Sequence, residues 1–125
     1  MKSRESVARL KRFQVEEKRR HVQQIEGMIA EFERMSADLA AQIKAEQERT
    51  GIHDTKHYAY STFAKAAAQR RDNLEASIGE LRIQLDVAAV ALDGAEEELA
   101  KLEALAERDH GRDQAAAQHK GDRVA

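Results

Sequence analysis

The sequence contains no cysteine, no proline and no tryptophan, and only five of its 125 residues are aromatic. Without cysteine the chain can form no disulfide and no thiolate metal site, which is typical of a reducing compartment. No apolar run approaches the roughly 20 residues that a membrane-spanning helix needs, and the first residues lack the apolar region of a secretory signal. So few aromatics, with a mean hydropathy of -0.72, also disfavour a compact globule with a layered core.

Charged residues are abundant, at 35% of the chain, and the formal net charge is only -2. A charged, alanine-rich chain without proline is typical of long helices and coiled coils. In residues 74–108 apolar side chains recur in alternating steps of four and three, which is a heptad repeat. Its members are Leu74, Ile78, Leu81, Leu85, Ala88, Leu92, Ala95, Leu99, Leu102 and Ala106. A similar repeat runs from Val15 to Ile43, interrupted by Lys18 and Ser36.

These patterns predict an all-α fold in which two long helices form an antiparallel coiled-coil hairpin. The expected arms cover about residues 4–49 and 62–108, with a loop at about 50–61. Gly51 can adopt the left-handed conformation that ends a helix, and Ser61 is a suitable N-cap for the next one. The last residues, 109–125, show no periodicity, and we expect a disordered tail there.

The charges beside the two repeats select one register of the hairpin. Flanking residues of antiparallel helices face each other, and their charges discriminate between registers more than they stabilise any one of them. Shifting the helices by one heptad in either direction places acids against acids. The favoured register pairs Arg12 with Glu103, Arg19 with Glu96 and Glu33 with Arg82.

The first twenty residues are strongly basic, with eight Lys or Arg and three acids. Extending the heptad frame backwards places Arg4, Lys11 and Lys18 in the seam between the helices and leaves Leu10 and Phe13 outside it. Alternatively, a shift of the frame returns the apolar side chains to the seam, or lysine stems simply cover apolar neighbours. The candidate partner-binding residues of this block are Arg4, Arg9, Lys11, Arg12, Lys18, Arg19 and Arg20.

The loop and the start of the second arm supply four further candidates. Tyr58 and Tyr60 either close the end of the coiled coil or form a docking site for a partner, since aromatic residues supply interface energy. Arg70 and Arg71 follow on the second arm. Arg71 falls at a seam position, where a charge usually fixes the register, but it could also reach Glu46 or a partner.

We expect no enzyme, metal or cofactor. His53 and His57 have a spacing that can bind metal, with Asp54 nearby, but the pattern spans a turn and offers no third ligand. No nucleophile turn, phosphate loop or carboxylate pocket is evident, and a two-helix hairpin has little interior in which to desolvate a reaction.

Two other functions are compatible with such a chain. The basic block could neutralise phosphates, but the chain is acidic overall and lacks known nucleic-acid-binding patterns, so we do not expect nucleic-acid binding. The other alternative is a generic scaffold that dimerises through the same seam, whereas the hairpin predicts a monomer.

With these features in place, the sequence resembles the FliJ family of flagellar export proteins, in the form found in alphaproteobacteria. The resemblance covers about residues 1–108, and the stretch from Gly51 to Leu74 is the most distinctive part because the heptad repeat does not dictate it. The matching segments are 1–5, 18–20, 24–26, 29–35, 51–54, 57–60 and 66–74.

The resemblance implies an antiparallel coiled coil similar to the central stalk of rotary ATPases. Proteins of this family associate with the hexameric ATPase of the flagellar type III export apparatus, contact the membrane export gate and handle export chaperones. They are cytoplasmic and peripherally associated with the apparatus at the inner membrane. By this resemblance the basic residues from Arg4 to Arg20 form the stalk end. Tyr58, Tyr60, Arg70 and Arg71 are then candidates for gate or chaperone contacts.

Overall fold

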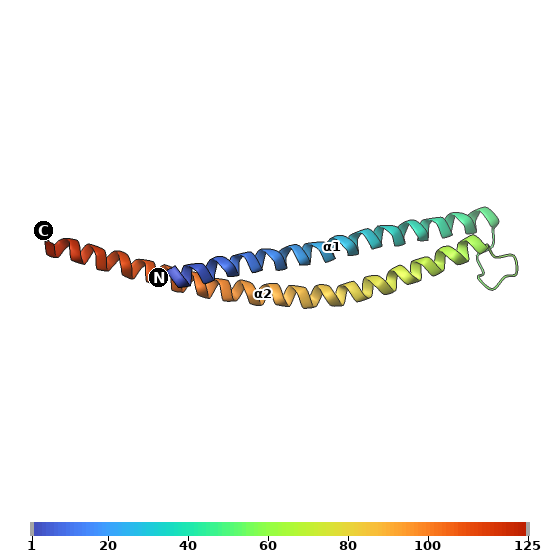
Figure 1. The fold of residues 1–125 in the computed structure, drawn as a ribbon. Coiled ribbons are helices and arrows are strands. Elements are labelled where there is room, and N and C mark those ends of the chain that lie inside the picture. Colours follow the sequence, from blue (N-terminus) through green and yellow to red (C-terminus); the bar gives the residue numbers. More distant parts are fainter. Residues whose placement is uncertain (1, 125) are drawn as a thin grey trace. The chain divides into compact units, whose positions relative to one another are not determined.

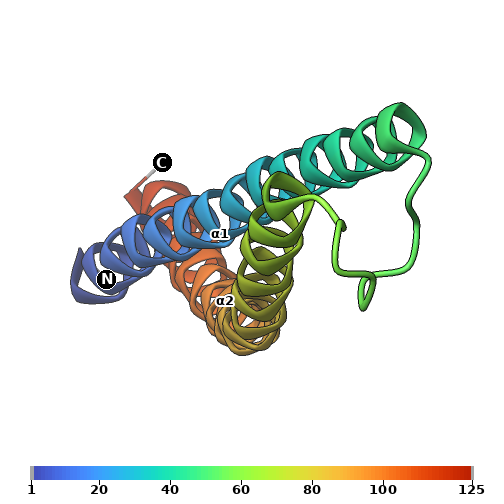
Figure 2. The same cartoon turned by 90° about the vertical axis from the view of Figure 1, so that its right-hand side faces the viewer.

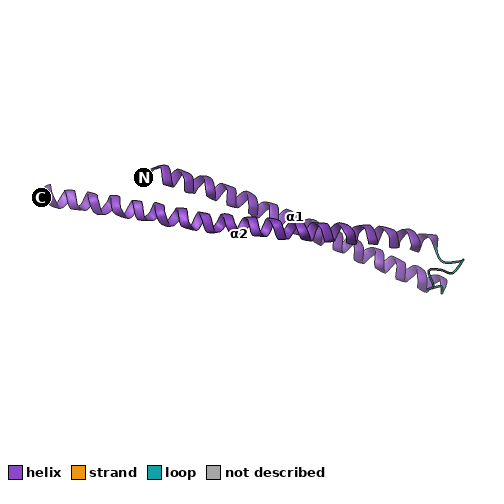
Figure 3. Cartoon of the chain, turned by 90° about the horizontal axis from the view of Figure 1, so that it is seen from below, coloured by secondary structure: helices purple, strands orange, loops and turns teal. Residues whose placement is uncertain are grey.

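The computed structural model describes the backbone of residues 2–124 and the side chains of residues 3–119 and 121. Helix α1 spans Lys2–Thr50 and helix α2 spans Thr62–Val124, and a loop of residues 51–61 joins them (Figures 1 and 3). The described part of the chain contains no strand. The two helices pack against each other as a helical hairpin, and the prediction of an all-α fold is confirmed.

The chain divides into two compact units. Unit 1 lies within the ranges Met1–Val22 and Ala88–Ala125, and unit 2 is the range Gln23–Val87. Unit 2 contains the loop, the last part of α1 and the first part of α2 (Figure 1). Unit 1 contains the other end of each helix, so in both units antiparallel segments of α1 and α2 pair with each other.

In unit 2 the buried residues follow the predicted heptads. Ile25 and Ile29 of α1 and Ile78 and Leu81 of α2 are buried, and Ile78 is only 1% exposed. Across the helices Arg82 donates a hydrogen bond to Glu33 at 2.7 Å, which is the pair expected for the chosen register. The heptad pattern therefore predicts both which faces meet and how they are aligned.

In unit 1 the same frame continues without interruption. Ala8 and Val15 of α1 and Ala88 and Ala95 of α2 are buried, whereas Phe13 is 58% exposed. Leu10 and Val7 are exposed as well. The alternative in which the frame shifts and returns these apolar residues to the seam is therefore wrong. Ala8 and Val15 occupy the seam positions of α1 instead, so the seven-residue spacing is kept.

The two remaining register pairs lie in unit 1 and are also confirmed. Arg12 Nη1 lies 3.4 Å from a carboxylate oxygen of Glu103. Arg19 Nη2 lies 3.2 Å from a carboxylate oxygen of Glu96. Such exposed pairs stabilise a hairpin little, but a shift by one heptad would lose all of them.

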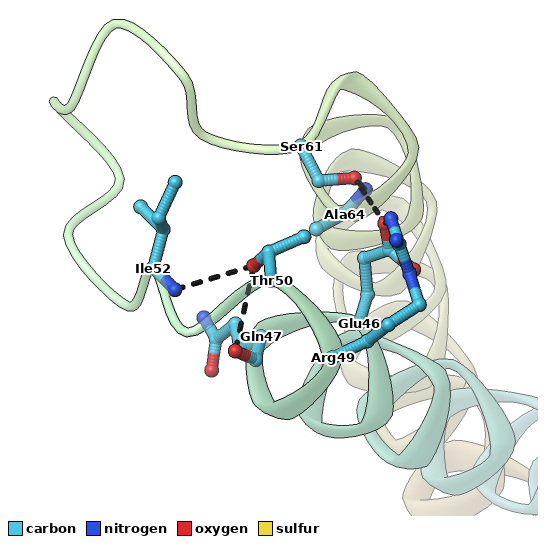
Figure 4. A network of polar contacts seen from close by, with 7 residues as sticks. All are labelled: Glu46, Gln47, Arg49, Thr50, Ile52, Ser61 and Ala64. Carbon is cyan, nitrogen blue, oxygen red and sulfur yellow. Dashed lines mark hydrogen bonds and ion pairs between the residues drawn. The ribbon is translucent and has the colours of Figure 1, made fainter.

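The turn between the helices uses both predicted capping residues. Gly51 has a φ of 75°, and its N–H donates to the carbonyl of Gln47 at 2.9 Å, which is the hydrogen bond of a left-handed helix cap. At the start of α2, Ala64 N–H donates to Ser61 Oγ at 3.2 Å, as an N-cap requires. Figure 2 shows the loop linking the two helix ends, and Figure 4 shows Ser61 and Ala64 from close by.

Replacing Gly51 with Ala should lower the free energy of unfolding by about 1–2 kcal/mol, because a Cβ is disfavoured in the left-handed conformation. The matched control is Gly27→Ala on α1, where a Cβ would meet no atom within 4 Å. That change should raise stability by about 0.5–1 kcal/mol through helix propensity. Urea denaturation followed by circular dichroism measures both, and shifts of the same sign would contradict the assigned helix end.

The C-terminal residues differ from expectation. We predicted that the second arm ends near residue 108 and that residues 109–125 are disordered, but α2 continues to Val124. The segment has no proline, and its Ala, Gln, Arg and Lys residues are good helix formers, so Gly111 and Gly121 weaken the helix by about 1 kcal/mol each without ending it. The missing periodicity reflects the lack of a packing partner for this part of the helix. The described side chains beyond Asp109 are all exposed, so this part of α2 packs against no partner helix.

Candidate functional site

The basic N-terminal residues divide into those that pair within unit 1 and those that do not. Arg4 donates to the carboxylate of Asp109 at 3.1 Å, and Asp109 is buried. Arg12 and Arg19 form the cross-helix pairs described above, and Arg19 also pairs with Glu16 on its own helix. The pKa of Arg19 is raised, chiefly by its hydrogen bond to Glu96. These three arginines are therefore used, at least in part, to hold the two helices together.

Lys11 and Lys18 lie in the seam, as the frame predicts. Lys11 is mostly buried and pairs with Glu98 of α2. That hydrogen bond, reinforced by the charges of Lys11, Lys101 and Lys18, lowers the pKa of Glu98. Glu98 therefore remains ionised to lower pH in the folded protein than in the unfolded chain. Its ionised form stabilises the fold, and this contribution is lost as the pH falls through the lowered pKa of Glu98.

Arg9 and Arg20 are the exceptions. Both are exposed, and neither forms an ion pair with any described residue. By their spacing along the helix they share one side of α1 with Phe13, and Leu10 lies next to Phe13 on that side. Leu10 and Phe13 are each 58% exposed. We call Arg9, Leu10, Phe13 and Arg20 the free N-terminal face. It combines exposed apolar side chains with two arginines that pair with no described acid, and Arg9 also lines a groove of about 480 Å³ with Glu103 and Glu107 of α2. Such a surface is complementary to an acidic, partly apolar protein surface.

The two tyrosines of the loop have different environments. Tyr60 is 7% exposed and packs with Ile43, Ala64 and Ala67 in a hydrophobic cluster. Its hydroxyl accepts a hydrogen bond from the side-chain amide of Gln47 at 3.0 Å. Tyr60 therefore closes the end of the helix pair, and little of its surface is available to a partner.

Tyr58, in contrast, is 96% exposed. Its ring stacks on the ring of His57 with a centroid distance of 4.6 Å. His57 is fixed in turn, because its Nδ1 accepts a hydrogen bond from the Ala59 N–H at 3.0 Å. Of the two predicted tyrosines, only Tyr58 presents a large surface at the tip.

Glu46 links the two ends of the turn (Figure 4). Its carboxylate accepts hydrogen bonds from Arg49 at 3.1 Å and from Ser61 Oγ at 3.1 Å. The Arg49 hydrogen bond is the main cause of its lowered pKa. Because Glu46 is engaged in this way, the expectation that Arg71 reaches it is wrong; Arg71 instead lies 3.7 Å from Asp72.

A groove of about 420 Å³ lies between the helices of unit 2, one heptad or more from the turn. Leu39 and Leu74 are half-buried in it, Met35 adds exposed apolar surface, and Asp38 and Arg70 contribute opposite charges from different helices. The full lining is Met35, Asp38, Leu39, Gln42, Arg70, Asn73 and Leu74. Neither Asp38 nor Arg70 forms an ion pair with a described residue, so both charges are available to a ligand.

Two polar residues occupy seam positions in the same part of the helix pair. Ser36 of α1 donates a hydrogen bond to Glu75 at 2.7 Å, and Arg71 occupies a seam position of α2. Neither of them lines the groove. The sequence predicts Arg70 as a site residue but does not predict the groove.

Neither a membrane-spanning helix nor a metal-binding cluster is found in the described residues. Among them no helix has the length and apolar character to cross a membrane. Over the same residues, His, Asp and Glu side chains nowhere gather in a group of three that could hold a metal ion.

The geometry defines a class of protein rather than an individual one: an all-α helical hairpin with a basic end and an apolar groove near its turn. No family model matches the chain, and no match is found among curated proteins or among solved structures.

Proposed function

We propose that the protein is a non-enzymatic stalk and adaptor of the flagellar type III protein export apparatus that associates with the hexameric export ATPase. The observation that carries this proposal is the free N-terminal face, where Arg9 and Arg20 form no ion pair with any described residue and lie beside exposed Leu10 and Phe13. Unneutralised arginines next to apolar side chains are typical of protein interfaces. The resemblance of the sequence to the FliJ family supplies the identity of the partner.

The hairpin fits an adaptor because its binding surfaces are spread along two helices rather than gathered in a pocket. A helix pair bound asymmetrically in a ring would contact each ATPase subunit differently. Differential contacts of this kind shift a conformational equilibrium and would bias the ATPase cycle without any chemistry by the hairpin itself.

The export gate and export chaperones are the other proposed partners. Two features of unit 2 support contacts with them: the exposed ring of Tyr58 and the groove beside Arg70. Apolar grooves between helices commonly receive an amphipathic helix. Arg70 would pair there with an acidic residue of the bound helix.

The proposal is tested with two double variants that remove the same charge. Arg9→Ala/Arg20→Ala removes the free cations, and Arg12→Ala/Arg19→Ala removes cations that are paired across the helices. Binding of labelled protein to purified export ATPase, measured by anisotropy, should weaken about tenfold for the first variant. It should change much less for the second, whose main effect is a lower melting temperature.

The salt dependence provides the control. The free cations should account for most of the loss of affinity between about 0.05 and 0.2 M salt, so Arg9→Ala/Arg20→Ala should flatten this dependence. Equal losses for the two variants, or none, would contradict the assignment of the free N-terminal face. A stable complex with bulk DNA at about 0.15 M salt would favour nucleic-acid binding instead.

A further inference from the structure

The outward side of α2 in unit 2 exposes large apolar side chains that the helix pairing does not use. Ile83 and Val87 are each 67% exposed. They lie four residues apart and therefore share one side of the helix. Ala76 and Gly79 continue this line toward the turn, and a Cβ on Gly79 would meet no atom within 4 Å. We call Ala76, Gly79, Ile83 and Val87 the outer stripe.

Two carboxylates border the outer stripe. Glu80 and Asp86 are three residues before and after Ile83, which places them about 60° to either side of it at 3.6 residues per turn. Both are exposed, and neither forms an ion pair with a described residue. An apolar line with an unneutralised acid on each side is thus presented to solvent.

Arg82 is the one basic residue between Asp72 and Val87, and it does not neutralise this surface. Its guanidinium pairs with Glu33 of α1 at 2.7 Å. The cross-helix pair therefore directs the guanidinium of Arg82 toward the other helix. The surface is left with apolar and acidic character alone.

We propose that the outer stripe is a docking surface for a basic amphipathic helix of another protein. Leu, Ile or Val side chains of that helix would cover Ile83 and Val87, and Lys or Arg on its two flanks would pair with Glu80 and Asp86. Gly79 has no side chain and permits a close approach of the partner's backbone. A second copy that docked through its own outer stripe is disfavoured, because it would place acids opposite acids.

The contact belongs to the weak and transient class. The outer stripe offers far less than the ~800 Å² that each partner contributes to a stable interface, so charge complementarity provides much of the specificity. The surface is separate from the free N-terminal face and from the groove beside Arg70. The proposal therefore goes beyond the export role above and stands or falls independently of it.

The probe is a labelled 18-residue synthetic helix with Leu along one side and Lys elsewhere, compared with a peptide in which Glu replaces every Lys. Binding to the full chain is followed by fluorescence anisotropy at low and moderate salt. We expect the lysine peptide to bind and the glutamate peptide to bind at least about tenfold more weakly. Equal binding of the two peptides would overturn the proposal.

Matched variants locate the contact. Ile83→Ser/Val87→Ser should weaken lysine-peptide binding about tenfold, whereas Met28→Ser, an exposed apolar residue of α1, should leave it unchanged. Glu80→Gln/Asp86→Asn should weaken binding about fivefold and flatten its salt dependence. Glu26→Gln/Glu48→Gln removes the same charge from exposed positions of α1 and should have little effect.

Each remaining outcome is decisive. If the two charge variants weaken binding equally, the attraction is unspecific and the outer stripe is not a docking surface. Sedimentation of the unmodified chain that shows a dimer, abolished by Ile83→Ser/Val87→Ser, would assign the stripe to self-association and overturn the proposal. Because all substituted side chains are exposed, unchanged circular dichroism should accompany every variant.

Discussion

Replacing Ile78 with Ala should lower the free energy of unfolding of the hairpin by about 2–3 kcal/mol. Ile78 is the largest fully buried side chain among the described residues, at 1% exposure. Its removal forfeits apolar burial and leaves a cavity that two straight helices close only partly. Urea denaturation followed by circular dichroism should show a lower midpoint with little change in the slope.

The same substitution at Ile83 is the matched control. Ile83 lies on the same helix, five residues further along, but is 67% exposed. Ile83→Ala should change stability by no more than about 0.5 kcal/mol, and in the stabilising direction, because Ala is the better helix former. If Ile83→Ala were as destabilising as Ile78→Ala, the assignment of the inner and outer sides of α2 would be wrong.

The contrast between these isoleucines was predictable from the sequence. Ile78 belongs to the seven-residue repeat and Ile83 does not, and in a hairpin the repeat selects the buried side. The register was predictable as well, since a shift of one heptad changes the sign of whole sets of facing charges. Arg12, Arg19 and Arg82 all pair with the expected acids. Periodicity and charge are properties of the chain itself, so no tertiary information was required.

Features that depend on how individual side chains are arranged in space were not predictable from the sequence. The register predicts that Arg12 faces Glu103, and the structure has this pair. The register does not predict the surroundings of Arg9, which forms no ion pair with a described residue but lines a groove with Glu103 and Glu107. The groove beside Arg70 was not predictable either, because its shape depends on how side chains of both helices pack beside each other.

The C-terminal segment shows a different limit. Loss of the heptads after Ala106 was interpreted as disorder, but periodicity reports a packing partner and not helicity. In residues 109–124 Ala, Gln, Arg and Lys favour a helix and no proline interrupts it, and α2 continues. Exposed apolar residues outside the repeat, such as Ile83 and Val87 at a spacing of four, were an available signal for the outer stripe.

The second large effect on stability is expected at a tyrosine of the loop. The sequence leaves open whether the two tyrosines close the hairpin or bind a partner. Tyr60→Ala should lower the free energy of unfolding by about 2–4 kcal/mol, since it removes a buried ring from the cluster with Ile43 and Ala64. Tyr60→Phe keeps the ring and loses only the hydroxyl that accepts from Gln47. It should cost about 0.5–1.5 kcal/mol, measured by the same urea titration.

Tyr58 is the control for this prediction and at the same time the better test of binding. Its ring is 96% exposed and contacts His57 within the loop, so Tyr58→Ala should change stability by less than about 0.5 kcal/mol. An equal loss of stability for Tyr58→Ala and Tyr60→Ala would contradict the division of roles between the two rings. If Tyr58→Ala reduces binding to the export gate or to export chaperones while the urea midpoint is unchanged, the exposed ring is a contact residue, because no loss of folded protein can explain the effect.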